Sequence, residues 1–230
     1  MITKATKDLL VFGATGGTGQ AIVHTALERG YGVTAFVRDI KHAKHVFNGL
    51  CSQLTFAEGD ALNPQDVNQA IGAGLHAVIS SLGFYHPLPG HDELTHATTN
   101  ILTAMTPAGI KRFICISSLG VGDSRNMGDM ATRLMQKTAL RFTLADKEKQ
   151  EAAICGSGID WTLIRPSRLM DGNGPPVSHT WSGTVPDKKL LWSVNRTQIA
   201  ELALDCLEDN TSIQQAINIT GCLGMNTDFT

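Results

Sequence analysis

Residues 9–19 read LLVFGATGGTG, and this stretch decides the fold. Its four leading apolar residues predict a short buried strand. The next segment, 20–29, carries apolar residues at helical spacing between Ile22 and Leu27, and Gly30 ends it. The sequence therefore predicts a strand, a glycine-rich turn and a helix in direct succession.

The glycines of this turn are spaced as Gly13-x-x-Gly16-x-x-Gly19. Gly13 permits a tight turn, Gly16 lets a phosphate approach the backbone, and Gly19 lets the helix pack closely on the strand. Free N–H groups and the positive end of the helix dipole would then face the phosphates. Glycines also mark ordinary turns, but their place between a strand and a helix favours a dinucleotide-binding site.

The composition is that of a globular domain without a strong charge bias. The chain has 230 residues, 42% of them apolar and 17% charged, with a net charge of −2. This length suits one α/β domain, and the charge gives no reason to expect nucleic acid or an anionic membrane as a partner. No apolar run approaches the roughly 18 residues of a membrane span, and residues 1–8 are too short and polar for a signal peptide.

Cysteines and histidines indicate neither a disulfide framework nor a metal site. The five cysteines are widely spread and include no Cys-x-x-Cys pair, which is typical of reduced thiols in a cytoplasmic protein. The eight histidines form no metal-ligand motif such as His-Glu-x-x-His. We therefore expect a cytoplasmic protein that binds no metal.

Strands and helices alternate along most of the chain. We expect strands at 31–37, 53–57, 76–83, 112–118 and 160–164, helices at 41–47, 64–71 and 91–105, and two helices or one bent helix within 123–155. This alternation predicts an α/β fold with a doubly wound, mostly parallel sheet flanked by helices, known as a Rossmann fold. Because no linker or repeat interrupts it, we expect a single domain spanning 1–230.

The C-terminal part is less regular, and we expect a small substrate-side region within 165–230. Glycines and prolines predict an irregular loop at 171–188. A short strand at 190–194, a helix at 197–207 and a last strand at 216–219 are expected to follow.

Arg38 and Asp39 stand where the second strand ends, about twenty residues after the glycine turn. This position meets the adenosine ribose in dinucleotide folds, where an acid favours NAD and an arginine favours NADP. Arg38 therefore favours NADP(H), and the alternative is a solvated arginine beside a ribose-binding Asp39. Asp60 would lie at the carboxyl edge of the sheet, either against adenine or as an ordinary turn acid.

Six motifs carry a resemblance to a known family. They read GATGGTG at 13–19, FVRD at 36–39, EGD at 58–60, SLG at 81–83, ISS at 116–118 and SGIDWTLIRP at 157–166. With these motifs in this order, the chain resembles the atypical short-chain dehydrogenase/reductase family. Within that family it is most similar to the flavin reductase and biliverdin-IXβ reductase branch, near the NmrA-like proteins.

The resemblance implies roles for individual residues. The implied cofactor-binding residues are Gly13, Thr15, Gly16, Gly17, Thr18 and Gly19 at the pyrophosphate, Arg38 at the 2′-phosphate, Asp60 and Ala61 near adenine, and Ser81, Leu82, Gly83, Ser117, Arg165 and Pro166 along the ribose and nicotinamide side. Ser118 matches a serine beside the nicotinamide, and with Ser167 and Arg168 it would face the substrate. We also expect His179 and Trp181, from the irregular loop, to cover a flat substrate.

A proton-donating tyrosine is missing. Most members of the wider superfamily use a Tyr-x-x-x-Lys pair, in which the lysine lowers the pKa of the phenol. Lys147 stands at a suitable distance after Ser118, but Thr143 takes the place of the tyrosine. The two tyrosines of the chain, Tyr31 and Tyr85, lie elsewhere. Lys147 is therefore a candidate catalytic residue, and the alternative is a solvated, charged helix face.

Two functions fit these residues. In the first, the protein is an NADPH-dependent oxidoreductase that passes a hydride to a flat conjugated acceptor, such as a flavin, a bilin or a quinone-like ring, while Ser118 orients the acceptor or relays a proton. In the second, it is a non-catalytic NADP(H)-binding redox sensor, similar to NmrA-like proteins. A sugar-nucleotide epimerase is disfavoured because the tyrosine is missing. The expected partner is a small aromatic molecule, and we expect a monomer or a small homo-oligomer.

Overall fold

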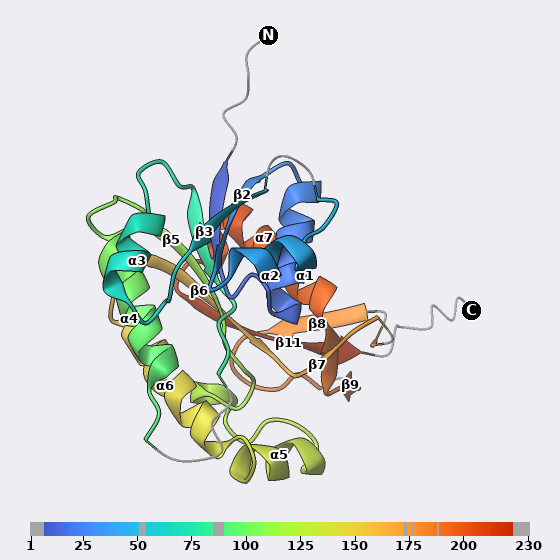
Figure 1. Cartoon of the computed structure of the whole chain (residues 1–230). Helices are drawn as coiled ribbons and strands as arrows, with labels where there is room; N and C mark the ends of the chain where they lie inside the picture. The colour runs from blue at the N-terminus through green and yellow to red at the C-terminus, as the bar shows by residue number, and fades with distance from the viewer. Residues whose placement is uncertain are drawn as a thin grey trace.

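One sheet forms the centre of the protein. The structure, a computed structural model, describes residues 7–50, 54–84, 90–172, 174–175, 177–187 and 189–222. The sheet runs in the order β3-β2-β1-β4-β5-β6-β11-β8, and β9 also pairs with β11 (Figure 1). All neighbours from β3 to β11 are parallel, whereas β8 and β9 run antiparallel to β11.

The strands of this sheet are β1 (Asp8–Phe12), β2 (Gly32–Val37), β3 (Leu54–Glu58), β4 (Ala77–Ser80), β5 (Arg112–Ile116), β6 (Asp160–Pro166), β8 (Val177–Trp181), β9 (Leu190–Leu191) and β11 (Gln215–Cys222). The helices are α1 (Gly17–Glu28), α2 (Ile40–Val46), α3 (Pro64–Ala70), α4 (Glu93–Met105), α5 (Met130–Lys137), α6 (Arg141–Cys155) and α7 (Arg196–Glu208), with short 3-10 turns η1 (Gly122–Ser124) and η2 (Asn210–Ser212). A second, two-stranded parallel sheet pairs β7 (Arg168–Met170) with β10 (Ser193–Asn195).

Helices cover both faces of the central sheet. The helices α1, α2 and α7 pack on one face, and α3, α4 and α6 pack on the other (Figure 1). Alternate residues of β1 enter the two cores, with Leu9 and Val11 in the first and Leu10 and Phe12 in the second. Because β1 is buried on both faces from Leu9 to Phe12, these four residues form a continuous apolar run. The predicted doubly wound α/β fold is confirmed.

The strand order reverses between β1 and β4. From β1 the chain moves outward to β2 and β3, and it then returns to β4 on the other side of β1. The crevice at the carboxyl ends of β1 and β4 is the place where open α/β sheets bind ligands. The fold therefore places the glycine-rich turn after β1 at this crevice.

The C-terminal third differs from the sequence prediction in two places. The run 171–188, predicted as an irregular loop, contains β8, and the single strand predicted at 190–194 is split between β9 and β10. The first difference arises because β11 extends to Cys222 and pairs with β8. The second arises because β9 pairs with β11, whereas β10 pairs with β7. Local glycines and prolines give no sign of such a distant pairing partner. Within 123–155, where the sequence predicts two helices or one bent helix, the structure has two helices, α5 and α6.

No helix in the part of the chain that the structure describes is both long and apolar enough to cross a membrane.

Candidate functional site

The glycine-rich turn joins β1 to α1 and requires glycine at two positions. Gly13 has a φ of +72°, and a Cβ there would lie 2.8 Å from the backbone of Ser81, just after β4. A Cβ on Gly19 would lie 2.1 Å from the carbonyl oxygen of Gly13. These close approaches hold the N-terminus of α1 over the crevice between β1 and β4, where its N–H groups can bind phosphate.

A cavity of about 440 Å³ opens beside this turn, and we call it the glycine-turn cavity. It brings together the predicted cofactor-binding residues Gly13, Thr15, Gly16, Gly17, Thr18, Arg38, Asp60, Ala61, Ser81, Leu82 and Gly83. Its other lining residues are Phe36, Val37, Leu62, Phe84, Leu169 and Arg196. Gly19 acts beneath the cavity, through the packing of α1 on the turn.

The charged side chains of the glycine-turn cavity suit a phosphorylated ligand. Arg38 and Arg196 line the cavity, and Asp60 is the acid among its lining residues. Asp39 instead caps α2, because its carboxylate accepts hydrogen bonds of 2.7 and 3.1 Å from N–H groups in the first turn of that helix. Asp60 lines the cavity, and its carboxylate also accepts a 3.0 Å hydrogen bond from the Leu62 N–H, as a turn acid does. Two cations and a tight backbone turn fit a dinucleotide.

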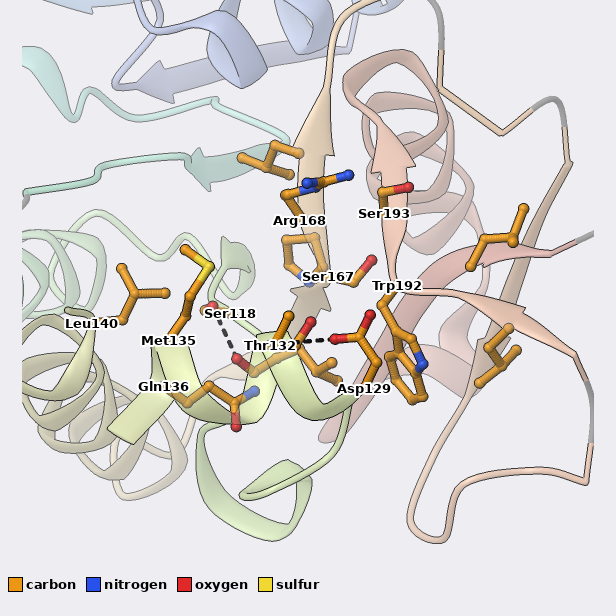
Figure 2. Close-up of a pocket in the computed structure, with 16 residues that line it drawn as sticks. Ser118, Asp129, Thr132, Met135, Gln136, Leu140, Ser167, Arg168, Trp192 and Ser193 are labelled. Atoms are coloured by element: carbon orange, nitrogen blue, oxygen red, sulfur yellow. Dashed lines mark hydrogen bonds between the residues drawn. The ribbon is translucent and has the colours of Figure 1, made fainter. Parts of the chain in front are cut away.

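A second cavity, of about 520 Å³, lies next to the first, and we call it the Ser118 cavity (Figure 2). Four predicted residues line it, namely Ser118, Pro166, Ser167 and Arg168. The other lining residues are Leu119, Asp129, Ala131, Thr132, Met135, Gln136, Leu140, Leu169, Leu190, Leu191, Trp192 and Ser193. Leu169 of β7 lines both cavities, so the two adjoin across this strand.

The Ser118 cavity has mostly apolar walls with a few polar groups. Met135, Leu140 and the ring of Trp192 stand around it, and Ser118 and Arg168 also line it (Figure 2). Its charged lining residues are Asp129 and Arg168. Hydrogen bonds at the start of α5, and more weakly the charge of Arg168, hold the pKa of Asp129 below its ordinary value. Such a cavity suits a flat, largely apolar ligand with a few polar substituents.

Ser117 and Arg165, which were predicted to bind the cofactor, line neither cavity. The Arg165 guanidinium is buried and donates to both carboxylate oxygens of Glu151 on α6, at 3.0 and 2.6 Å. Ser117 donates to the same carboxylate, and Asp123 also pairs with Arg165. Burial opposes the charge of Arg165, but these carboxylates raise its pKa overall. The cluster holds α6 against β5 and β6 behind the Ser118 cavity.

Lys147 is buried too, which contradicts the solvated helix face that was the alternative to a catalytic role. Its side chain is in the interior, and Nζ donates a 3.2 Å hydrogen bond to the carbonyl oxygen of Ile116. Burial lowers the pKa of Lys147. It lines neither cavity, and it does not belong to a solvated helix face. Its neighbour Asp146 is also buried and accepts the Leu94 N–H at 2.9 Å, at the start of α4. Asp146 therefore connects α6 to α4.

His179 and Trp181 lie on β8 and line neither cavity. The Trp181 ring packs edge-on against Trp192 with 6.4 Å between ring centroids, and His179 stacks on Trp181. Trp192, which the sequence analysis did not single out, is the aromatic residue that reaches the Ser118 cavity. The sequence analysis also did not predict that Arg196 lines the glycine-turn cavity. A cation in the first turn of a helix opposes the helix dipole, and this unfavourable position could have indicated a functional role.

Comparisons with known proteins identify the family. The NAD(P)H-binding family matches residues 13–210 of the chain. The chain belongs to this family. An uncharacterised chloroplastic protein of Arabidopsis thaliana is 30% identical over 222 residues, which cover 93% of this chain and 76% of the relative. Protein TIC 62 of rice, also chloroplastic, is 27% identical over 233 residues; the match covers 90% of this chain and 45% of TIC 62.

Solved structures confirm the fold of this NAD(P)H-binding protein. A short-chain dehydrogenase/reductase from Veillonella parvula in complex with NADP superposes with a TM-score of 0.77 at 18% identity, covering 95% of each chain. ChuY, an anaerobilin reductase from Escherichia coli O157:H7, superposes with a TM-score of 0.74 at 23% identity, covering 97% of this chain and 98% of ChuY. The NAD(P)-binding Rossmann fold expected from the six motifs is thus confirmed.

Proposed function

We propose that the protein is an NADPH-dependent reductase whose acceptor is a flat conjugated molecule bound in the Ser118 cavity. One observation carries this proposal: the glycine-turn cavity and the Ser118 cavity adjoin at Leu169. A dinucleotide along the first cavity would reach toward the second, whose apolar walls suit a flavin, a bilin or a quinone-like ring. The likeness to an NADP complex and to an anaerobilin reductase supports this choice of reaction.

The protein's work in this reaction is to bind, orient and exclude water. When bound, NADPH supplies a hydride, and a proton from water completes the two-electron reduction of the acceptor, which leaves NADP⁺ and the reduced acceptor. Ser118 at the wall of the cavity would orient a polar substituent of the acceptor, and Arg168 would face a negatively charged one. Holding the two reactants together can supply much of the rate enhancement.

The described residues favour an acceptor that needs no tyrosine acid. Tyr31 stands at the amino end of β2, whereas the glycine-turn cavity lies at the carboxyl ends of the strands, and it donates a 2.7 Å hydrogen bond to Glu208. Burial and this hydrogen bond raise the pKa of Tyr31 to about 12. Tyr85 lies outside the described residues. Lys147 is buried behind β5. Conjugated rings accept hydride without protein acid catalysis, whereas ketones depend on it.

Arg38 supports NADPH as the preferred cofactor. It lines the glycine-turn cavity where β2 ends, while the competing acid Asp39 is occupied in capping α2. An arginine at this position can pair with the 2′-phosphate that only NADP(H) carries.

We expect the cytoplasm as the compartment, because the described cysteines, Cys115, Cys155, Cys206 and Cys222, are free thiols.

The test is oxidation of NADPH, with NADH alongside, against FMN, biliverdin isomers and small quinones. The proposal predicts turnover with NADPH on at least one acceptor. Arg38→Ala should lower the NADPH rate at limiting cofactor and leave the NADH rate unchanged, while Ser118→Ala should alter the acceptor KM without changing NADP⁺ binding. Equal oxidation rates with NADPH and NADH in the wild type would contradict the proposed role of Arg38 in binding the 2′-phosphate.

A non-catalytic NADP(H)-binding redox sensor is the second candidate. It is favoured by the lack of a tyrosine acid among the described residues that line the two cavities. A sensor predicts tight NADPH binding with no oxidation on any acceptor. It also predicts that the surface around the Ser118 cavity differs between the NADP⁺ and NADPH states, which hydrogen exchange would measure.

A further inference from the structure

We infer that Arg196 is a second cationic residue that binds the cofactor, at its diphosphate, and we call this contact the clamp. When no cofactor is bound, Asp171 pairs with Arg196 instead. The inference rests on NAD(P)H binding in the glycine-turn cavity. It assigns the diphosphate charge to a residue from the far end of the chain, separate from the Arg38 that would meet the 2′-phosphate.

The position of Arg196 relative to the glycine turn supports the first part. Its side chain lies across Gly17, the first residue of α1, so closely that a Cβ on Gly17 would be 2.8 Å from Arg196 Nε. Gly16, the N-cap of α1, has no side chain to accept the N–H groups of the first turn. A diphosphate bound by those N–H groups would therefore meet the Arg196 guanidinium from the opposite side.

The pairing of β7 with β10 explains why Asp171 meets Arg196. The two strands are parallel, with Met170 opposite Asn195 at their carboxyl ends. The next residue on each side is Asp171 and Arg196, and these form an ion pair. The guanidinium is thus held at the rim of the glycine-turn cavity by the same strand pair that separates this cavity from the Ser118 cavity.

The energetics favour a functional role over a structural one. Asp171 is 83% exposed, and an ion pair with such an exposed partner contributes little to stability because water and salt screen it. As the first residue of α7, Arg196 also opposes the positive end of that helix dipole. A diphosphate brings two negative charges and better geometry than one exposed carboxylate, so it can replace Asp171 as the partner of Arg196.

The test is the affinity of the full chain for three probes: NADP⁺, NAD⁺ and 2′-AMP, measured by calorimetry. NADP⁺ and NAD⁺ carry the diphosphate, whereas 2′-AMP carries only the 2′-phosphate. Arg196→Met should weaken NADP⁺ and NAD⁺ by the same factor, about 10- to 100-fold, and leave 2′-AMP unchanged. Arg38→Met should weaken NADP⁺ and 2′-AMP but not NAD⁺. Arg125→Met, which removes an exposed ion pair and changes a residue that lines neither cavity, is the matched control and should change none of them.

Asp171→Asn tests the exchange of partners. If Asp171 competes with the diphosphate, its neutral variant should bind NADP⁺ and NAD⁺ about two- to fivefold more tightly, with 2′-AMP unchanged. Unchanged dinucleotide affinity in Arg196→Met overturns the clamp, and so does an equal loss of 2′-AMP affinity. Unchanged or weaker dinucleotide binding in Asp171→Asn overturns the exchange. A wild type that binds all three probes but reduces no acceptor overturns the reductase and leaves the clamp standing.

Discussion

The glycine-turn cavity and the Ser118 cavity share Leu169 but are built in opposite ways. The first lies at the ends of β1 to β4, where backbone turns supply most of its lining. The second is enclosed by α5, β7, β9 and Trp192, which come from distant parts of the chain and contribute mainly side chains. A cofactor common to a whole family can be bound by backbone that the fold itself positions, whereas the acceptor needs walls that differ from one protein to the next.

The supports of the two cavities differ in the same way. Close backbone packing at Gly13 and Gly19 fixes the glycine turn. Behind the Ser118 cavity, the buried charges of Glu151 and Arg165 hold α6 against the sheet. The variants below separate these two kinds of support.

The largest effect is expected from Glu151→Ala. This change leaves the Arg165 guanidinium buried with only Asp123 as an acidic partner, and it should lower the free energy of unfolding by about 3–5 kcal/mol. Urea unfolding would measure it. Glu148→Ala on the same helix breaks an exposed pair with Arg125 and should cost at most about 1 kcal/mol. Equal losses in the two variants would contradict a buried support at Glu151.

Gly19→Ala should act on the glycine turn. The added Cβ would overlap the carbonyl oxygen of Gly13, so α1 must move, and we expect a loss of about 1–3 kcal/mol in stability together with a marked loss of NADP⁺ affinity. Gly72→Ala is the matched control, because a Cβ there meets no atom within 4 Å. Normal NADP⁺ binding by a folded Gly19→Ala variant would argue against backbone packing as the support of this cavity.

Trp192→Ala should affect the Ser118 cavity alone. Loss of this partly buried ring removes about 1–2 kcal/mol of contact with a flat acceptor, so the acceptor KM should rise about five- to thirtyfold. The NADP⁺ affinity of the same variant should stay at the wild-type value. Trp181→Phe, one layer further from the cavity, should change the acceptor KM little. A larger rise of the acceptor KM in Trp181→Phe than in Trp192→Ala would indicate that Trp181, and not Trp192, contacts the acceptor.

The smallest effect is a dependence of stability on pH that comes from Lys147. Burial lowers the pKa of Lys147 in the folded chain, so the unfolded chain binds its proton more readily. Stability should therefore rise as the pH increases from that lowered pKa to the ordinary value of about 10.4. Lys147→Met should lack this rise, which paired urea titrations between about pH 7 and 10 would detect. Parallel curves for the two proteins would contradict the lowered pKa.

The sequence predicts the glycine-turn cavity well, because each strand end there carries its own local motif. Gly13, Arg38, Asp60 and Ser81 meet in one cavity for this reason. The Ser118 cavity forms through pairings between segments that are distant in the sequence. No local sequence pattern therefore predicts that Trp192 lines it and Trp181 does not.

Charge patterning misled the sequence analysis in α6. The run from Asp146 to Glu151 reads as a solvated face, yet these two residues are buried against partners on α4 and β6. A sequence does not reveal which charges will find a buried partner, because that depends on how the helices pack.

The most direct test of the central claim is a single-turnover experiment. Wild-type protein is loaded with one equivalent of NADPH and mixed with FMN, biliverdin isomers or small quinones, and nicotinamide absorbance is followed. The two-cavity account predicts rapid loss of that absorbance with at least one acceptor, and a slower loss in Trp192→Ala at the same NADPH loading. Tight NADPH binding with no loss of absorbance on any acceptor would contradict it and favour the sensor.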